Sequence, residues 1–202
     1  VTDGFDLGIG ILFPTMAPGV ERETAIATIK PVWDANQTWL VLGGGSNLVM
    51  AEYIDKTVLQ VGLQGKKLLR EDDDAWYVAA AGGEAWHPFV QWTLAQGWGG
   101  LENLSLIPGT VGGAPVQNIG AYGVELCQFI ESVTAWRVAE QKYVTLSRAE
   151  CDFGYRDSIF KRAKRGQWLI VSVRFALPKA WQPVLTYPDL AGHPQLVLGS
   201  QS

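Results

Sequence analysis

The stretch from residue 107 to residue 123 reads IPGTVGGAPVQNIGAYG, and it decides how this chain can fold. It belongs to a longer glycine-rich, largely uncharged stretch, residues 97–123, which is too long for an unstructured connection in a compact domain. Small residues let a backbone lie flat against a large planar ligand, and Gln117 and Asn118 offer directional donors and acceptors for its polar edge. Alternatively, the glycines only let two chain segments cross in close contact.

A second glycine-rich element lies earlier in the chain. A predicted strand at residues 39–42 runs directly into Gly43, Gly44, Gly45, Ser46 and Asn47. Backbone N–H groups of such a turn can point outward and bind anionic oxygens, with side-chain donors from the serine and the asparagine. The lysine of a P-loop is missing, and a leucine breaks the G-x-G-x-x-G pattern at its last glycine. The element therefore predicts a phosphate cradle of another kind, with a plain turn between strands as the alternative.

The remaining pattern mixes helices and strands. Helical spacing predicts a helix over residues 21–36, which Pro31 kinks or ends, and another over about 84–96. Strands are predicted at residues 39–42, 57–61, 76–81, 130–138, 142–146 and 168–175. Because these elements do not follow a strict βα alternation, an α+β fold is favoured over a doubly wound sheet.

Composition limits the classes of protein to consider. The 202 residues are 48% hydrophobic and 18% charged, as expected for a globular chain with a buried core. A net charge of −4 provides no positive field for a nucleic acid. No segment approaches the roughly 20 apolar residues of a membrane span, and the early apolar run at residues 7–13 has no basic residue before it. We therefore expect a cytoplasmic protein that binds neither nucleic acid nor membrane.

Other reactive groups are sparse. Cys127 and Cys151 have neither metal-ligand nor disulfide-framework spacing and are interpreted as reduced thiols. His87 and His193 are too few for a metal cluster or a Ser-His-Asp triad, and His87 is expected at the surface near the start of the 84–96 helix. The acidic run at residues 71–74 and the basic run at 161–165 are interpreted as solvated connections, with phosphate contact as the alternative for the basic run.

Several motifs together resemble the UDP-N-acetylenolpyruvoylglucosamine reductase family. They occur in the family's order: GGGSN at residues 43–47, GLENLSLIPG at 100–109, QNIGAYGVEL at 117–126 and FGYRDS at 153–158. A further segment, WQPVLTY at residues 181–187, is similar to one group within that family. The resemblance extends from about residue 37 to residue 190.

This resemblance implies a fold and a cofactor. The fold is an FAD-binding domain of the vanillyl-alcohol-oxidase (PCMH) type, with non-covalent FAD between two α+β subdomains. It implies a first subdomain at residues 1–52, a second at 53–190, and a tail at 191–202 where a substrate-binding domain begins. Gly43 to Asn47 are expected to hold the FAD pyrophosphate. The rest of the cofactor is assigned to Pro108, Gly109, Gly112, Gly113, Gln117, Asn118, Gly120, Tyr122 and Gly123.

The resemblance also implies a reaction. NADPH reduces FAD, and the reduced flavin reduces the enolpyruvyl ether of UDP-N-acetylglucosamine enolpyruvate to UDP-N-acetylmuramate, a precursor of peptidoglycan. Hydride addition at one alkene carbon builds negative charge at the other, so the site needs a cation at the carboxylate and a proton donor. Arg156 is assigned as the cation, since a guanidinium can grip a carboxylate with two hydrogen bonds. Tyr155 is assigned to orient the substrate and Tyr187 to contact its UDP phosphates.

Two alternatives stay open from the residues alone. The sequence Tyr155-Arg156-Asp157 can form a local surface salt bridge, and Tyr187 can be a simple loop aromatic. The family's serine proton donor and a late glutamate are expected beyond residue 202, so the chain is expected to lack the C-terminal substrate-binding domain. The second functional hypothesis is therefore a non-catalytic module that binds FAD or a nucleotide.

Overall fold

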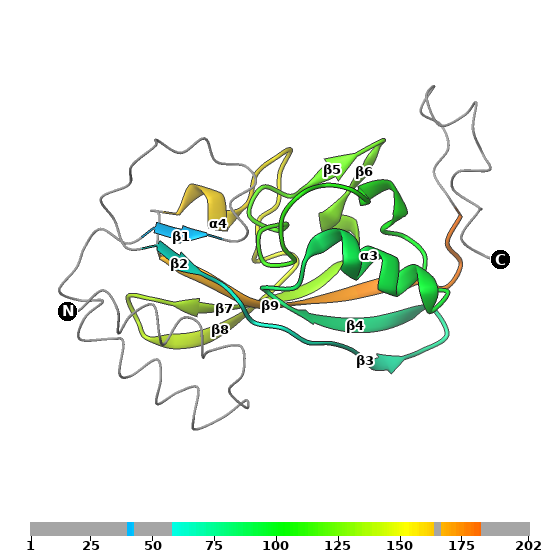
Figure 1. The fold of residues 1–202 in the computed structure, drawn as a ribbon, viewed down its shortest axis with the longest axis horizontal. Coiled ribbons are helices and arrows are strands. Elements are labelled where there is room, and N and C mark those ends of the chain that lie inside the picture. The colour runs from blue at the N-terminus through cyan, green and yellow to red at the C-terminus, as the bar shows by residue number, and fades with distance from the viewer. Residues whose placement is uncertain (1–39, 43–57, 164–166, 183–202) are drawn as a thin grey trace.

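A computed structural model describes residues 40–42, 58–163 and 167–182 (Figure 1). The helix predicted over residues 21–36 lies outside these residues. Within the described part, no helix has the length and apolar character that crossing a membrane requires. Helices and strands are mixed without βα alternation, which confirms the α+β class.

A five-stranded antiparallel sheet forms the base of the described structure (Figure 1). In spatial order its strands are β3 (Lys66–Glu71), β4 (Ala75–Ala81), β9 (Trp168–Pro178), β7 (Ile130–Arg137) and β8 (Lys142–Ser147). The strand that comes last in the sequence thus takes the central position and pairs with both β4 and β7. The four strands predicted for β4, β7, β8 and β9 are confirmed.

Strand β3 was not predicted, and its position explains why. Five of its six residues are exposed, because it lies at the edge of the sheet and pairs only with β4. It is held by backbone hydrogen bonds and not by burial of alternate side chains, so its sequence carries no period-2 pattern.

Two smaller strand pairs lie apart from this sheet. Strands β1 (Leu40–Leu42) and β2 (Val58–Gln60) pair in parallel, which confirms the strands predicted at residues 39–42 and 57–61. They stand on either side of residue 52, where the sequence analysis divided the chain, and that division stays a prediction. Strands β5 (Gly120–Ala121) and β6 (Val124–Glu125) form a short hairpin inside the glycine-rich stretch.

Helix α3 (Trp86–Ala95) confirms the helix expected over residues 84–96 and packs on one face of the sheet (Figure 1). Its buried residues Trp86, Phe89, Val90 and Thr93 follow the helical spacing of one face. No side chain caps its N-terminus; instead, the Trp86 N–H donates to the Gly109 carbonyl at 3.0 Å. The other helical turns in the described part of the chain are η2 (Glu102–Leu104), η3 (Leu126–Gln128) and α4 (Ile159–Arg162).

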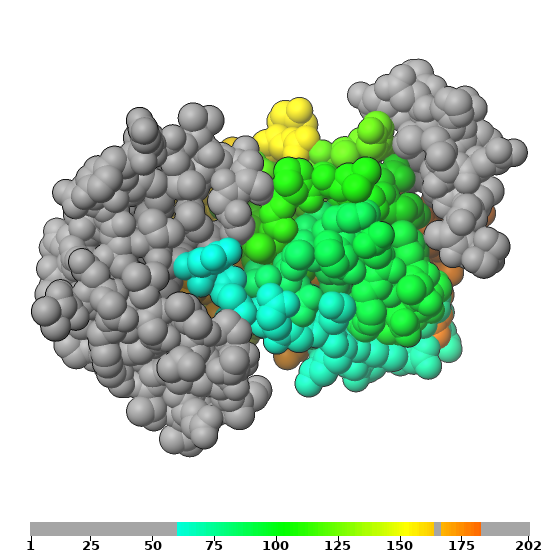
Figure 2. All heavy atoms as spheres, viewed as in Figure 1, coloured from blue at the N-terminus to red at the C-terminus, as the bar shows by residue number. Residues whose placement is uncertain are grey.

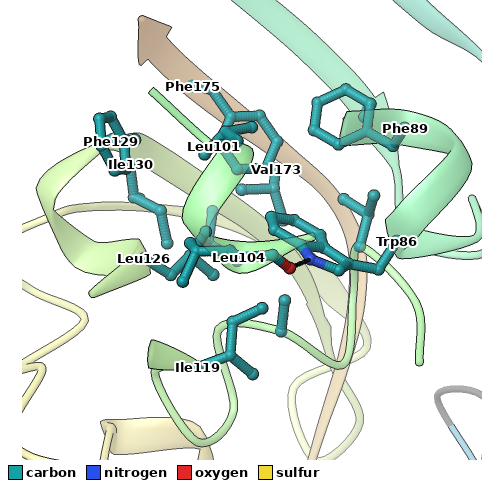
Figure 3. Close-up of a cluster of buried hydrophobic side chains, with 14 of the residues drawn as sticks. Trp86, Phe89, Leu101, Leu104, Ile119, Leu126, Phe129, Ile130, Val173 and Phe175 are labelled. Atoms are coloured by element: carbon teal, nitrogen blue, oxygen red, sulfur yellow. Dashed lines mark hydrogen bonds between the residues drawn. The ribbon is translucent and has the colours of Figure 1, made fainter. Parts of the chain in front are cut away.

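The core lies between the sheet and a layer made of α3 and the glycine-rich stretch (Figure 3). Leu101, Leu104, Val111 and Ile119 of that stretch are each at most 3% exposed. The buried Trp86 indole N–H donates to the Leu104 carbonyl at 2.7 Å and ties the helix to this layer. The stretch is therefore ordered in part by its own apolar residues.

Replacing Trp86 with phenylalanine tests the contribution of the hydrogen bond to Leu104. The substitution leaves the buried Leu104 carbonyl without its donor and opens a small cavity, so the free energy of unfolding should fall by about 2–3 kcal/mol. Urea denaturation measures the change, with Trp136→Phe on the half-buried face of β7 as a matched control. Equal losses for the two variants would show that the hydrogen bond to Leu104 contributes nothing specific.

Candidate functional site

Two chain segments cross at glycines where the glycine-rich stretch meets the sheet. The Gly82 N–H donates to the Val171 carbonyl at 2.7 Å, and the Gly112 N–H donates to the Gly82 carbonyl at 2.8 Å. A Cβ added to Gly112 would lie 2.9 Å from the Gly82 oxygen. At Gly112 the structure therefore has the backbone crossing that the sequence left as an alternative to ligand contact.

The neighbouring Gly83 belongs to the same crossing and was missed by the sequence analysis. Its N–H donates to the Leu63 carbonyl at 2.9 Å, and an added Cβ would lie 2.5 Å from the Val61 oxygen. The available signal was the glycine pair at the end of a predicted strand, where a close approach of another backbone is common.

Other parts of the glycine-rich stretch leave the backbone accessible. Gly109, Gly113 and Gly120 are half-buried, and Pro108 is exposed. Gly109 has a φ of +132°, which lies in the region that favours glycine. Gln117 is also half-buried. A ligand can therefore approach the chain at these residues, and their role in binding it stays a prediction.

The Asn118 side chain has a different surrounding. It is 1% exposed, and its Nδ2 donates to the Glu125 carboxylate at 3.1 Å and to the Gly154 carbonyl at 3.0 Å. Its Oδ1 accepts the Cys127 N–H at 2.9 Å. The amide thus joins the β5–β6 hairpin to the segment around residue 154, so a ligand would meet Asn118 through its backbone and not through this side chain.

Tyr155 and Arg156 occupy the tip of a tight reverse turn. Gly154 and Asp157 exchange two backbone hydrogen bonds, of 3.0 and 3.1 Å, which close the turn. Tyr155 is 85% exposed at this tip. The Arg156 guanidinium donates to the Gly120 carbonyl at 2.6 Å. The structure therefore brings the residue assigned to the substrate carboxylate directly against the stretch assigned to the cofactor.

The local salt bridge that the sequence allowed for Arg156 is not formed within the described part of the chain. Asp157 pairs instead with Arg162. The Ser158 hydroxyl donates to the Val116 carbonyl at 2.6 Å. Together with the hydrogen bonds of Asn118 and Arg156, this bond joins residues 116–120 to residues 154–158. Figure 2 shows these segments side by side, in green and yellow, at the upper edge of the molecule.

Left-handed backbone conformations occur at several residues other than glycine. Leu106, Asn118, Tyr122 and Arg156 have φ values of 62°, 42°, 50° and 53°, and Gln141 and Asp152 have values of 52° and 46°. Each such residue costs about 1–2 kcal/mol relative to a glycine in that conformation. Strain of this kind concentrates at functional sites, where the surrounding contacts impose the geometry. Asn118 and Arg156 lie in the two segments that their own hydrogen bonds join.

The remaining assigned residues, Gly43 to Asn47 and Tyr187, lie outside the described residues, and their roles stay predictions. Among the residues that the structure does describe, no group of His, Cys, Asp and Glu could hold a metal ion. His87 is half-buried, and its Nδ1 accepts the Leu106 N–H at 3.3 Å.

The two cysteines are unpaired, as expected. Burial raises the pKa of the Cys151 thiol to about 12, and burial also raises the pKa of the Cys127 thiol. Both therefore remain protonated at neutral pH, and neither has the character of a nucleophile.

A family model described as an FAD binding domain matches residues 19–147. The chain belongs to this family. FAD is accordingly its cofactor, and the α+β FAD-binding fold expected from the sequence is confirmed. The match extends across β1, the crossing at Gly82 and Gly112, and the β5–β6 hairpin.

Curated relatives narrow the likeness further. This FAD-binding chain is 59% identical over 166 residues to the UDP-N-acetylenolpyruvoylglucosamine reductase of Paraburkholderia phymatum, covering 82% of this chain and 48% of that protein. It is 59% identical over 157 residues to the reductase of the same name from Bordetella pertussis, covering 78% and 45%. The chain thus spans a little under half the length of these relatives.

Solved structures show the same architecture. The UDP-N-acetylenolpyruvylglucosamine reductase of Thermus caldophilus superposes with a TM-score of 0.53 at 26% identity, over 81% of this chain and 56% of that one. An alkyldihydroxyacetonephosphate synthase superposes with a TM-score of 0.50 at 14% identity, over 78% of this chain and 30% of that one, and shares the fold alone.

Proposed function

We propose that this chain is the flavin-binding part of a reductase that converts UDP-N-acetylglucosamine enolpyruvate to UDP-N-acetylmuramate in peptidoglycan synthesis, with NADPH as the hydride donor. The observation that carries the proposal is the hydrogen bond from Arg156 to Gly120, which puts an exposed guanidinium beside the cofactor stretch of an FAD-binding domain. The likeness to two curated reductases at 59% identity supports the substrate. Since NADPH and UDP-sugars are cytoplasmic metabolites, we assign the reaction to the cytoplasm.

The described residues fit FAD at particular places. Half-buried Gly109, Gly113 and Gly120 leave backbone open to a planar ring system, and Gln117 adds a side-chain amide. Gly112 serves the backbone crossing, and its contribution is to hold the stretch in place. The pyrophosphate is assigned to Gly43–Asn47 by the sequence pattern. When bound there, FAD would supply the redox chemistry, hydride transfer from NADPH to the alkene.

Arg156 supplies the electrostatic part of the reaction. Its Nη2 donates to Gly120, which leaves the rest of the planar guanidinium to meet the carboxylate of the enolpyruvyl group. When the alkene is reduced, negative charge develops toward that carboxylate, and a fixed cation stabilises it more strongly than it stabilises the neutral alkene. Tyr155, exposed at the neighbouring position of the turn, orients the substrate.

Reconstitution with FAD tests the cofactor assignment. The purified chain, incubated with excess FAD and freed of unbound cofactor, should keep a flavin absorption spectrum. Its melting temperature should rise, since a ligand saturating the native state at about 100 times its Kd adds about 2.7 kcal/mol of stability. A colourless protein with an unchanged melting temperature would rule out the flavin site.

Two further additions separate an enzyme from a binding module. In the full-length gene product, NADPH should bleach the bound flavin, and the enolpyruvyl substrate should then restore its colour under anaerobic conditions. A full-length protein that keeps its colour with NADPH would be a binding module, the second hypothesis from the sequence.

A further inference from the structure

Arg162, in the basic run at residues 161–165, makes a bridge across the base of the Arg156 turn. One arm of its guanidinium donates to the Asp157 carboxylate, at the end of the turn. The other arm donates to the Asp152 carboxylate and, at 2.9 Å, to the Asp152 carbonyl, before the turn begins. A single planar side chain therefore holds both ends of the segment from residue 152 to residue 157.

Lys161 acts on the same turn from the preceding position. Its ammonium donates to the Arg156 carbonyl at 2.6 Å. Arg156 has a φ of 53°, so this carbonyl belongs to a residue whose backbone is not in its preferred conformation. The hydrogen bond from Lys161 stabilises that conformation from outside the turn.

Both basic residues stand on an anchored element. The Ser158 hydroxyl caps α4 by accepting the Lys161 N–H at 3.4 Å and donates to the Val116 carbonyl at 2.6 Å. Phe160 of the same helix is 8% exposed and packs edge-on against Trp168, with ring centroids 5.7 Å apart. Helix α4 is therefore tied to the core and to the glycine-rich stretch.

We propose that Arg162 is a positioning residue that holds the Tyr155–Arg156 turn against Gly120, so that the Arg156 guanidinium meets the substrate at a fixed place. The substrate part of this inference rests on the proposed function. The carboxylates of Asp152 and Asp157 accept from one guanidinium, whose rigid fork fixes their separation as a lysine cannot.

The exposure of these groups decides what the bridge contributes. The side chains of Arg162 and Asp152 are 44% and 77% exposed. Ion pairs this exposed contribute little to folding, because water and salt screen them. The effect of the bridge is therefore expected in the order of the turn and in the rate of reaction, with little change in overall stability. At Lys161 and Arg162 the basic run thus also makes contacts within the protein, and a phosphate contact stays a prediction.

NMR relaxation of the FAD-bound chain tests the positioning directly. Backbone order parameters at Tyr155 and Arg156 should be near the rigid value of about 0.85 in the parent chain and fall below about 0.6 in Arg162→Gln. Arg174→Gln, which removes an exposed arginine from β9, is the matched control and should leave both values unchanged. Unchanged order at the turn in Arg162→Gln would overturn the inference, whatever reaction the protein catalyses.

A kinetic measurement on the full-length gene product gives the second readout. Arg162→Gln should slow flavin reoxidation by the enolpyruvyl substrate about 10- to 100-fold, because small misplacements of a binding group are costly, and should leave flavin reduction by NADPH unchanged. Arg162→Lys keeps the charge without the fork and should be slowed comparably; full activity in this variant would overturn the bridge. If the parent protein does not reoxidise, the proposed function fails, and the order parameters alone decide the positioning.

Discussion

Replacing Arg156 with alanine should lower the rate of flavin reoxidation by UDP-N-acetylglucosamine enolpyruvate about 100- to 1,000-fold in the full-length gene product, the usual loss when one group that stabilises transition-state charge is removed. Flavin binding should be unchanged, because the guanidinium reaches the cofactor stretch by a single exposed hydrogen bond to the Gly120 carbonyl. A φ of 53° is about equally unfavourable for alanine and for arginine, so the substitution does not change the conformational strain of the turn. Anaerobic stopped-flow absorbance of the flavin measures the rate.

Two controls define the role of Arg156. Arg156→Lys keeps a positive charge but cannot grip a carboxylate with two hydrogen bonds, so its rate should lie between those of the parent and the alanine variant. Flavin reduction by NADPH should be equal in all three proteins. Loss of FAD from Arg156→Ala would show that the side chain is structural and would remove it from the substrate site.

Replacing Gly83 with alanine should lower the free energy of unfolding by about 3 kcal/mol or more, the upper end of the range for overpacked sites. An added Cβ at this position would lie 2.5 Å from the Val61 oxygen and 2.6 Å from both the nitrogen and the oxygen of Leu63. All three are backbone atoms, so no side chain can rotate away to make room. Urea denaturation of the two proteins measures the difference.

Gly154→Ala is the matched control for this second substitution. An added Cβ there would meet only the Asp157 Cβ at 3.7 Å, an ordinary contact, so the loss should be within about 0.5 kcal/mol. FAD affinity should fall in Gly83→Ala because Gly82 and Gly112 of the same crossing hold the cofactor stretch against the sheet. If Gly83→Ala is as stable as the control, the backbone segments at the crossing can move apart with no loss in the free energy of unfolding.

The major elements of the fold were readable from local pattern. Strands β4, β7 and β9 and helix α3 each carry a buried apolar face, and burial of that face stabilises them. Strand β3 and the four-residue helix α4 were missed, because pairing at a sheet edge and anchoring by a neighbouring segment leave no such period. The glycine-rich stretch was correctly expected to be ordered.

In the candidate site, too, some features follow from local sequence and others from tertiary packing. Gly109, Gly120 and Arg156 could be proposed from short motifs, since residue type alone indicates which groups can approach a flavin or grip a carboxylate. The saturated surroundings of the Asn118 amide could not be foreseen, because its partners Glu125, Cys127 and Gly154 are chosen by the packing of two separate segments.

Motif and periodicity were enough to predict an α+β chain that binds FAD and to propose Arg156 as the carboxylate-binding residue, because such predictions depend on residue types and their local order. The meeting of Arg156 with Gly120, the crossing at Gly82 and the bridge made by Arg162 depend on distances between segments far apart in the chain. Such distances are set by the packing of the whole domain. No local pattern encodes them, so only the folded structure shows which glycines of this stretch stay accessible and which let two backbones cross.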